Sequence, residues 1–431
     1  MTRFLARLSP RVTIDPADIR LWSRTLPLRA RLSLAAGRAA STASQTLGKG
    51  GGAVIGGDVA VRLYPRALEM LAAGRRIALV SGTNGKSTTT QMLAAALETV
   101  GRVAHNRGGS NMENGLVTAL DAARDARLGA LEVDEAYLGP ISRAVHPHSI
   151  TLMNLSHEFT RGVSYKREAQ HWRDTVTRIG PGAIFVANAD DPLVAWAAWE
   201  APRVVWVSGG LFWRENALLC RGCLRPLAWD GPSFSCEQCG LHRPDPAWSI
   251  DGDTFVTPEG RLTPALAMPG RANLTNGLFA VATADLFGVP LPEAVEAVGR
   301  VGEVDGRFAA FEVDGRLVRL HMIKNSASWN ETLQLLAADA EAGVVLAIDD
   351  FGLTGRDTAT IWDTPVELLR DRRVVASGRR RDDIAVRLAV AGAAVETVAD
   401  HLDGVRRCPP GPVHVVTNYS AFNALKRRLT R

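Results

Sequence analysis

Short apolar segments alternate with longer amphipathic segments along most of the chain. From residue 76 onward the apolar segments predict strands at 77–81, 129–133, 149–154, 183–187 and 203–207, with helices between them. Regular alternation of strands and helices is typical of a mostly parallel, doubly wound sheet, in which ligands bind at the carboxyl ends of the strands. We therefore predict an α/β fold for this part of the chain.

The same alternation begins again further along, after a cluster of Gly, Asp and Glu between Val301 and Gly306. We predict a second, Rossmann-like α/β unit with strands at 308–313, 317–323, 343–348, 372–376 and 413–416 and helices at 328–340, 380–391 and 420–429. Two further helices, at 273–287 and 291–299, precede the boundary. The expected domains are an N-terminal helical segment at 1–75, a central domain at 76–302 and a C-terminal domain at 303–431.

Residues 27–75 are rich in small residues and have a helical pattern, interrupted by Gly48-Lys49-Gly50-Gly51-Gly52. That tract is either a flexible turn or a place where the backbone approaches a ligand. The chain has 431 residues, which is too long for one compact core. Its net charge of +5 is compatible with anionic substrates or membrane headgroups.

No apolar stretch is long enough for a membrane span, and the N-terminus lacks the pattern of a signal peptide. We therefore expect a cytoplasmic protein, in which cysteines stay reduced. No basic run with interleaved aromatic residues suggests nucleic-acid binding.

Residues 78–88 combine an apolar strand with a glycine-rich turn that ends in Lys86 and Ser87. Backbone N–H groups of such a turn bind phosphate, the lysine adds a positive charge, and the hydroxyl of Ser87 can ligate Mg²⁺. The general phosphate-loop pattern has a glycine where this chain has Val80, so a turn without a ligand is the alternative. The loop favours a nucleotide-dependent protein.

Four cysteines in residues 211–245 interrupt the α/β pattern. Cys220 and Cys223 form one Cys-x-x-Cys pair, and Cys236 and Cys239 form a second pair twelve residues later. This spacing predicts a zinc ribbon inserted in the central domain, with a closed site of four thiolates and a structural role. A redox role is the second possibility, and Cys408 is an ordinary loop cysteine.

Polar residues follow several predicted strands. Glu132, Asp134 and Glu135 come at the end of one strand, where a carboxylate can reach Mg²⁺ on bound phosphates. Residues 188–192 (Asn-Ala-Asp-Asp-Pro) follow another strand, and Asn273 and Asn276 lie one helical turn apart, which suits nucleotide contact. Surface acids, turns and helix caps are the structural alternatives for these motifs.

Taken in chain order, the motifs resemble those of the Mur ligase superfamily. The motifs are Gly-Thr-Asn-Gly-Lys-Ser-Thr at 82–88, Glu-Val-Asp-Glu-Ala at 132–136, Asn-Ala-Asp-Asp-Pro at 188–192 and Pro-Gly-Arg-Ala-Asn-Leu-Thr-Asn-Gly at 269–277. The resemblance implies an enzyme that uses ATP to phosphorylate a carboxylate, after which an amine displaces the phosphate.

Within that superfamily, residues 27–431 are most similar to the MurT group. The similarity rests on the glycine-rich segment at 48–57, the four-cysteine insert and three C-terminal motifs, at 323–331, 355–363 and 417–422. Members of this group pair with a glutamine amidotransferase subunit, GatD. The resemblance implies amidation of the second-position D-glutamate of lipid II with ammonia from glutamine, at the inner face of the membrane.

The resemblance also implies roles for individual residues. Glu132 and Ser87 would hold Mg²⁺, and Lys86 and Glu132 would be catalytic. Asp357, with Asp363 as the reserve, would complete the Cys–His glutaminase triad of the partner. The nucleotide would be bound by Thr83, Asn84, Gly85, Lys86, Ser87, Thr88, Asn273, Asn276 and Arg307.

Three stretches depart from the family pattern. Residues 156–162 replace a stretch that is acidic in the family, with His157 and Glu158 as candidate substitutes; the others are 326–328 and Thr354. The departures keep two alternatives open. One is a stand-alone amide ligase that acts on a different carboxylate and amine, and the other is a nucleotide-binding regulatory or scaffold protein without catalysis.

Overall fold

The structure is a computed structural model, and it describes residues 26–47, 53–106, 109–156, 164–210, 214–304, 307–351 and 358–430. The chain divides into two compact units. One contains residues 1–301 apart from 156–165 and 268–272, and the other contains those two segments with residues 302–431. Within the described ranges, no helix combines the length and the apolar character that a bilayer span requires.

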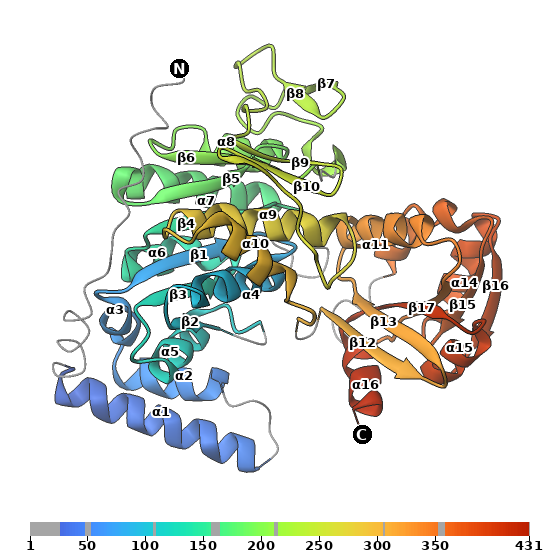
Figure 1. Cartoon of the computed structure of the whole chain (residues 1–431), viewed down its shortest axis with the longest axis horizontal. Helices are drawn as coiled ribbons and strands as arrows, with labels where there is room; N and C mark the ends of the chain where they lie inside the picture. The colour runs from blue at the N-terminus through green and yellow to red at the C-terminus, as the bar shows by residue number, and fades with distance from the viewer. Residues whose placement is uncertain are drawn as a thin grey trace. The chain divides into compact units, whose positions relative to one another are not determined.

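The first unit is built on a nine-stranded sheet (Figure 1). Its central strands are continuous apolar runs that are buried on both faces, as expected for parallel strands between helices. The strands lie in the order β11 (Gly260–Leu262), β10 (Thr254–Thr257), β9 (Trp248–Asp251), β6 (Val204–Ser208), β5 (Ile184–Asn188), β4 (Ser149–Leu152), β1 (Arg76–Ser81), β3 (Leu128–Glu132) and β2 (Val103–His105).

The pairing is parallel from β2 to β9 and antiparallel from β9 to β11. The predicted doubly wound sheet is therefore confirmed, and the five predicted strands are β1, β3, β4, β5 and β6. The alternation did not indicate β2 or the antiparallel edge β9–β11, because these strands are short and lie at or near the margins of the sheet.

Helices cover the sheet, and additional helices precede its first strand in the chain. Three of them, α1 (Leu28–Thr46), α2 (Ala53–Leu63) and α3 (Ala67–Ala72), precede β1, and α2 packs between α1 and α5 (Figure 1). The glycine tract at 48–52 lies outside the described residues. The other helices are α4 (Lys86–Glu98), α5 (Glu113–Ala122), α6 (Leu138–Val145), α7 (Tyr165–Ile179), α8 (Pro192–Ala198), α9 (Arg271–Asp285) and α10 (Leu291–Gly299).

The four-cysteine insert has a small sheet of its own. Strands β7 (Ala228–Asp230) and β8 (Ser233–Ser235) form an antiparallel hairpin. Its core contains Leu227, Phe234 and Leu241 with Cys220 and Cys236, and Trp196, Trp206 and Trp229 pack against it. A core of this size gives limited stability by burial, so we expect the cysteines to supply part of the stability of the insert.

The second unit has a six-stranded sheet with helices on both faces. Apolar residues of its strands alternate between a core beneath α11, α13 and α14 and a core beneath α15 and α16. Only β12 is antiparallel to its neighbour. The order is β12 (Phe308–Val313), β13 (Arg316–Met322), β17 (Pro412–Thr417), β14 (Gly343–Ala347), β15 (Arg373–Ser377) and β16 (Ala394–Val398).

The helices of this unit are α11 (Ser326–Ala338), α13 (Ala359–Trp362), α14 (Arg381–Val390), α15 (His401–Arg407) and α16 (Tyr419–Leu429). All five predicted strands and all three predicted helices are present, within two residues at each end. Strand β16 and helix α15 were not predicted.

Candidate functional site

The glycine-rich turn of the first unit joins the buried strand β1 to helix α4. The loop is anchored by Asn154, which follows the neighbouring strand β4. Its backbone carbonyl accepts from the Thr83 N–H at 2.8 Å, and its side chain bonds both the N–H and the carbonyl of Asn84, at 2.8 and 2.9 Å. These three bonds hold one side of the turn against the end of β4, and helix α4 begins directly after the turn.

Gly85 precedes α4 in the left-handed conformation, with φ of 82°. A side chain there would be strained, and its Cβ would also collide with the side-chain amide of Asn276. No side chain caps α4, so the N–H groups of its first turn are available to an anion. An uncapped helix N-terminus behind a left-handed glycine fits a bound phosphate group.

Lys86 is almost fully buried and lies among carboxylates. Its Nζ is 2.8 Å from Oε2 of Glu135 and also donates to the carbonyl of Gly82. Burial by itself would lower the pKa of Lys86. The carboxylates of Glu135, Glu132 and Asp134 outweigh that effect and raise the pKa above its ordinary value, so the lysine is charged.

Glu132 lies at the carboxyl end of β3, next to β1 in the sheet, and is 1% exposed. Asn111 donates its amide N–H to Oε1 of Glu132 at 3.2 Å, which holds the carboxylate in place. The Asn106 side chain bonds the backbone of Glu132 in both directions. A fixed carboxylate and a nearby hydroxyl-bearing loop offer the oxygen ligands that Mg²⁺ prefers.

A further acid, Glu168 on α7, belongs to the same electrostatic environment. Burial raises the pKa of Glu168, and the negative charges of Glu135 and Asp134 raise it further. His171, one turn later on the helix, is 3.5 Å from its carboxylate. In the sequence, the i, i+3 spacing of Glu168 and His171 on an amphipathic helix could have indicated that these two side chains interact.

Asp190 has a different environment from the phosphate loop. Its fully buried carboxylate accepts two bonds from Arg243, at 2.9 and 2.7 Å, together with bonds from the Ser208 hydroxyl and the Gly210 N–H. Asp191 caps α8 and also accepts from the Leu155 N–H. Asp190 thus connects the end of β6 with the segment that follows the four cysteines of the insert.

The four predicted cysteines of the insert come together in space. Their Sγ atoms all lie within 4.8 Å of one another, with 3.4 Å between Cys220 and Cys239 and 3.4 Å between Cys223 and Cys236. Tetrahedral zinc with Zn–S bonds of about 2.3 Å requires sulfurs about 3.8 Å apart. The cluster therefore fits a four-thiolate metal ion.

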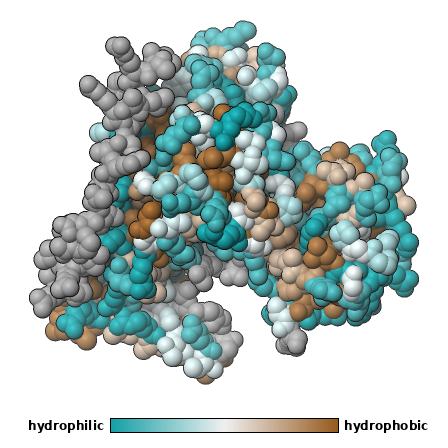
Figure 2. Space-filling view, in the orientation of Figure 1, coloured by the Kyte–Doolittle hydropathy of each residue, from teal (hydrophilic) through white to brown (hydrophobic). Residues whose placement is uncertain are grey.

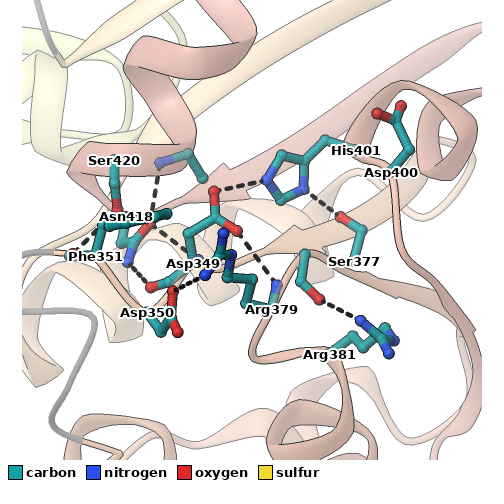
Figure 3. Close-up of polar contacts among 12 residues, drawn as sticks. Asp349, Asp350, Phe351, Ser377, Arg379, Arg381, Asp400, His401, Asn418 and Ser420 are labelled. Atoms are coloured by element: carbon teal, nitrogen blue, oxygen red, sulfur yellow. Dashed lines mark hydrogen bonds and ion pairs between the residues drawn. The ribbon is translucent and has the colours of Figure 1, made fainter.

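The second unit has a hydrogen-bonded cluster at the carboxyl edge of its sheet (Figure 3). The Ser377 hydroxyl lies 3.0 Å from Nδ1 of His401, and Nε2 of His401 lies 3.1 Å from the Asp349 carboxylate. That carboxylate also accepts from the Arg379 N–H, and the Asn418 side chain bonds the Asp349 backbone. The bond from His401 is the main reason why the pKa of Asp349 is lowered. Because Ser377 is fully buried, the trio holds neighbouring strand ends together rather than presenting a nucleophile.

The remaining predicted residues are distributed over both units. Thr88 is buried in the first turn of α4, and Ser87 and Asn273 are half-buried. In the second unit, Asp363 is exposed after α13, and Arg307 lies 3.8 Å from the sulfur of Met322. Asp357, Thr354, His157 and Glu158 lie outside the described residues.

Sequence reasoning did not assign Asn154 or Asn111 to the site, and it named Glu135 only as one of three acids at a strand end. Glu135 belongs to a motif that was recognised, but its pairing with Lys86 depends on the turn after β3. Asn154 follows a predicted strand that neighbours the phosphate loop in a parallel sheet, so a polar residue at that strand end was the available signal.

Two family models match the chain. The Mur ligase middle domain matches residues 80–210, and the MurT ligase C-terminal domain matches residues 322–422. The MurT subunit of lipid II isoglutaminyl synthase (glutamine-hydrolyzing) from Streptococcus pneumoniae is 26% identical over 86% of this chain and 89% of its own length. The subunit of the same name from Staphylococcus aureus is 23% identical over 84% and 88%.

Solved structures of peptide ligases share the fold. A pseudomurein peptide ligase type C from Methanothermus fervidus aligns with a TM-score of 0.63 at 16% identity, over 82% of this chain and 78% of its own. MurF from Acinetobacter baumannii aligns with a TM-score of 0.62 at 16% identity, over 86% and 80%. The motifs, the fold and the order of the two matched domains agree. The chain therefore has a Mur ligase middle domain followed by a MurT ligase C-terminal domain, and it is similar over most of its length to MurT subunits.

Proposed function

We propose that this protein is an ATP-dependent carbon–nitrogen ligase that amidates a carboxylate of lipid II with ammonia, together with a glutaminase partner. The observation that supports this most directly is the buried, charged Lys86 at an uncapped helix N-terminus, in a chain with a MurT-type C-terminal domain. The curated relatives are named as subunits of a glutamine-hydrolyzing lipid II isoglutaminyl synthase, which supports the substrate, the nitrogen source and the partner.

ATP would bind with its phosphates at the turn between β1 and α4. The backbone N–H groups of the turn and of the first turn of α4 would bind phosphate oxygens, and Lys86 would move from Glu135 toward them. Asn276 lies against Gly85, which supports its proposed contact with the nucleotide. Thr83, Asn84, Ser87, Thr88, Asn273 and Arg307 complete the proposed nucleotide site.

Glu132 and the Ser87 hydroxyl would hold Mg²⁺, which would supply charge neutralisation between the phosphates and the approaching carboxylate. The residues of the chain have two tasks in this reaction. Lys86 stabilises negative charge on the transferred phosphoryl group, and Asn111 keeps the Glu132 carboxylate in position. The acceptor carboxylate attacks the terminal phosphorus of ATP and ADP leaves, and ammonia then attacks the acyl phosphate, so that phosphate and a proton leave and the amide forms.

The four-cysteine cluster would hold one structural Zn²⁺, since all four ligand positions are filled by thiolates. In the C-terminal domain, Asp357 would orient the histidine of the glutaminase partner, with Asp363 as the reserve. A lipid substrate would place the protein in the cytoplasm, at the inner face of the membrane.

The experiment is to combine the protein with a class I glutaminase, glutamine, Mg²⁺ and ATP, and to analyse lipid II by mass spectrometry. The product has an amide in place of one carboxyl group, and its formation requires both proteins. Lys86→Ala should abolish it, whereas Lys426→Ala, a matched change at a lysine paired with Glu303, should have no effect.

Two results would contradict the proposal. Full activity of Lys86→Ala would exclude phosphate activation by this loop. A product that forms from another carboxylate and an amine, without the glutaminase, would assign the protein as a stand-alone amide ligase.

A further inference from the structure

Helix α1 has two opposite apolar faces. The face that contains Ala30, Leu34 and Gly37 is buried against the rest of the first unit. With 100° of rotation per residue, Leu28, Leu32, Ala35, Ala39 and Ala43 fall on the other side of the helix, and all five are exposed. Leu28 is 69% exposed and Leu32 is 61% exposed. A surface helix normally has polar residues on that side.

The charges around this exposed stripe all have the same sign. Arg29 and Arg31 flank it on either side and form no ion pair with a described residue, and Arg38 pairs with Asp121 of α5. Helix α1 contains no Asp or Glu. In Figure 2, brown and pale residues lie among teal ones along the lower edge of the molecule, where α1 runs in Figure 1.

Helix α2 has a second exposed apolar region. Val54, Ile55 and Leu63 are about half exposed or more, and Arg62 is exposed beside them. Glycines at the contact of α1 with α2, Gly37 and Gly56, leave no room for a Cβ, so the two helices pack closely as one hairpin. Both exposed regions therefore belong to one packed pair of helices.

We propose that this face of α1 and α2, here called the α1–α2 face, docks the protein onto an anionic lipid bilayer. Leucines and alanines between arginines, with no acid on the helix, match the pattern of helices that lie in the membrane interface. A second copy of the chain is a poorer partner. Parallel two-fold pairing of α1 with itself would bring the arginines of one copy against those of the other, and antiparallel pairing would give them no acidic partner, because α1 contains no Asp or Glu.

The α1–α2 face is connected to the phosphate loop by direct packing. Gly57 of α2 lies against the backbone of Asn114 at the start of α5, and Asn111, just before that helix, holds Glu132. Docking through this face would therefore hold the site on one rigid body at the membrane surface, where a lipid-linked carboxylate is found. This inference rests on the proposed function for the identity of that substrate.

The test is flotation of the full chain with vesicles of phosphatidylcholine alone or mixed with phosphatidylglycerol. The wild-type protein should float with the anionic vesicles only, and added salt should weaken binding. Leu28→Ser with Leu32→Ser should weaken binding about tenfold or more. Arg29→Gln with Arg31→Gln should weaken it about fivefold per charge, with a reduced dependence on salt. Leu218→Ser with Val390→Ser, at similarly exposed positions elsewhere, is the matched control.

Three results would overturn the inference. They are failure of the wild-type protein to float, flotation of the double leucine variant at the wild-type level, and a wild-type dimer that this variant converts to a monomer. Amidation of a soluble, lipid-free stem peptide separates the inference from the proposed function. The leucine variant should retain that activity, whereas absence of the activity in the wild-type protein would contradict the function itself.

Discussion

The buried ion pair between Asp190 and Arg243 joins the four-cysteine insert to the nucleotide-binding unit, and its removal gives a quantitative prediction. The Asp190 carboxylate is completely buried and the Arg243 side chain is 17% exposed. Arg243 follows β8, and its N–H bonds the carbonyl of Phe234 within the insert. Arg243→Ala therefore removes a connection that starts in the insert and ends at Asp190 after β5 and at Ser208 of β6.

The magnitude follows from what remains around Asp190. Without Arg243 the carboxylate keeps bonds from Ser208 at 3.0 Å and from the Gly210 N–H at 2.8 Å, but no positive charge. An unpaired buried charge costs about 3–5 kcal/mol. Asp190→Asn in the Arg243→Ala background replaces that charge by a neutral amide, so it should recover at least half of the loss.

Urea unfolding followed by tryptophan fluorescence measures these changes in the free energy of unfolding, because Trp172 and Trp248 of the first unit are buried. Arg261→Ala is the matched control. Its partner is Asp251, and both side chains are more than half exposed, so the loss should be about 0–1 kcal/mol. A loss below 1 kcal/mol for Arg243→Ala, or no recovery on adding Asp190→Asn, would refute the reasoning.

Three further predictions concern other parts of the molecule. Metal analysis should find one zinc ion per chain, and a strong chelator should unfold the insert while the central sheet stays folded; a metal-free, folded insert would contradict this. Burial lowers the pKa of His321 to about 3, so the folded protein resists a proton that the unfolded chain accepts below pH 6.5. Its stability should therefore fall by about 1.4 kcal/mol per pH unit below that value, and His321→Gln should flatten the dependence in unfolding experiments at several pH values. His401→Ala should raise the pKa of Asp349, measured by NMR, and destabilise the second unit by about 1–3 kcal/mol because the buried Ser377 hydroxyl loses its partner; an unchanged pKa would exclude the hydrogen bond.

The parts of the site that the sequence predicted are those in which neighbours in the chain are neighbours in space. The phosphate loop binds mainly through its own backbone, so its residues are contiguous. The cysteine pairs bring two ligands each within four residues, and their convergence needs only one hairpin. Apolar runs in the interior of each sheet are continuous, which is why the central strands were found with small errors at their ends.

The parts that were missed depend on which strands lie side by side. Strand β1 has β3 and β4 as neighbours, so Glu135 and Asn154 reach the phosphate loop from 49 and 70 residues away. Because the carboxyl ends of parallel strands lie at one edge of the sheet, the sequence indicates the region in which these residues lie. It does not indicate which side chain reaches the phosphate loop. Strand β16 escaped prediction for another reason. As the last strand of its sheet it is partly exposed and includes Glu396, so no apolar run marks it.

His401 was missed as a consequence, because it begins the helix that follows β16. A residue at the end of a strand or helix can be predicted as a site residue only when that strand or helix is itself predicted. A different limit explains why Asp190 was interpreted only as one of two acids in a turn motif, although the strand before it was predicted. Its partner Arg243 lies beyond the whole insert, 53 residues later. The contacts that hold these two clusters together are thus long-range contacts, and their strength comes from burial that local sequence patterns do not encode.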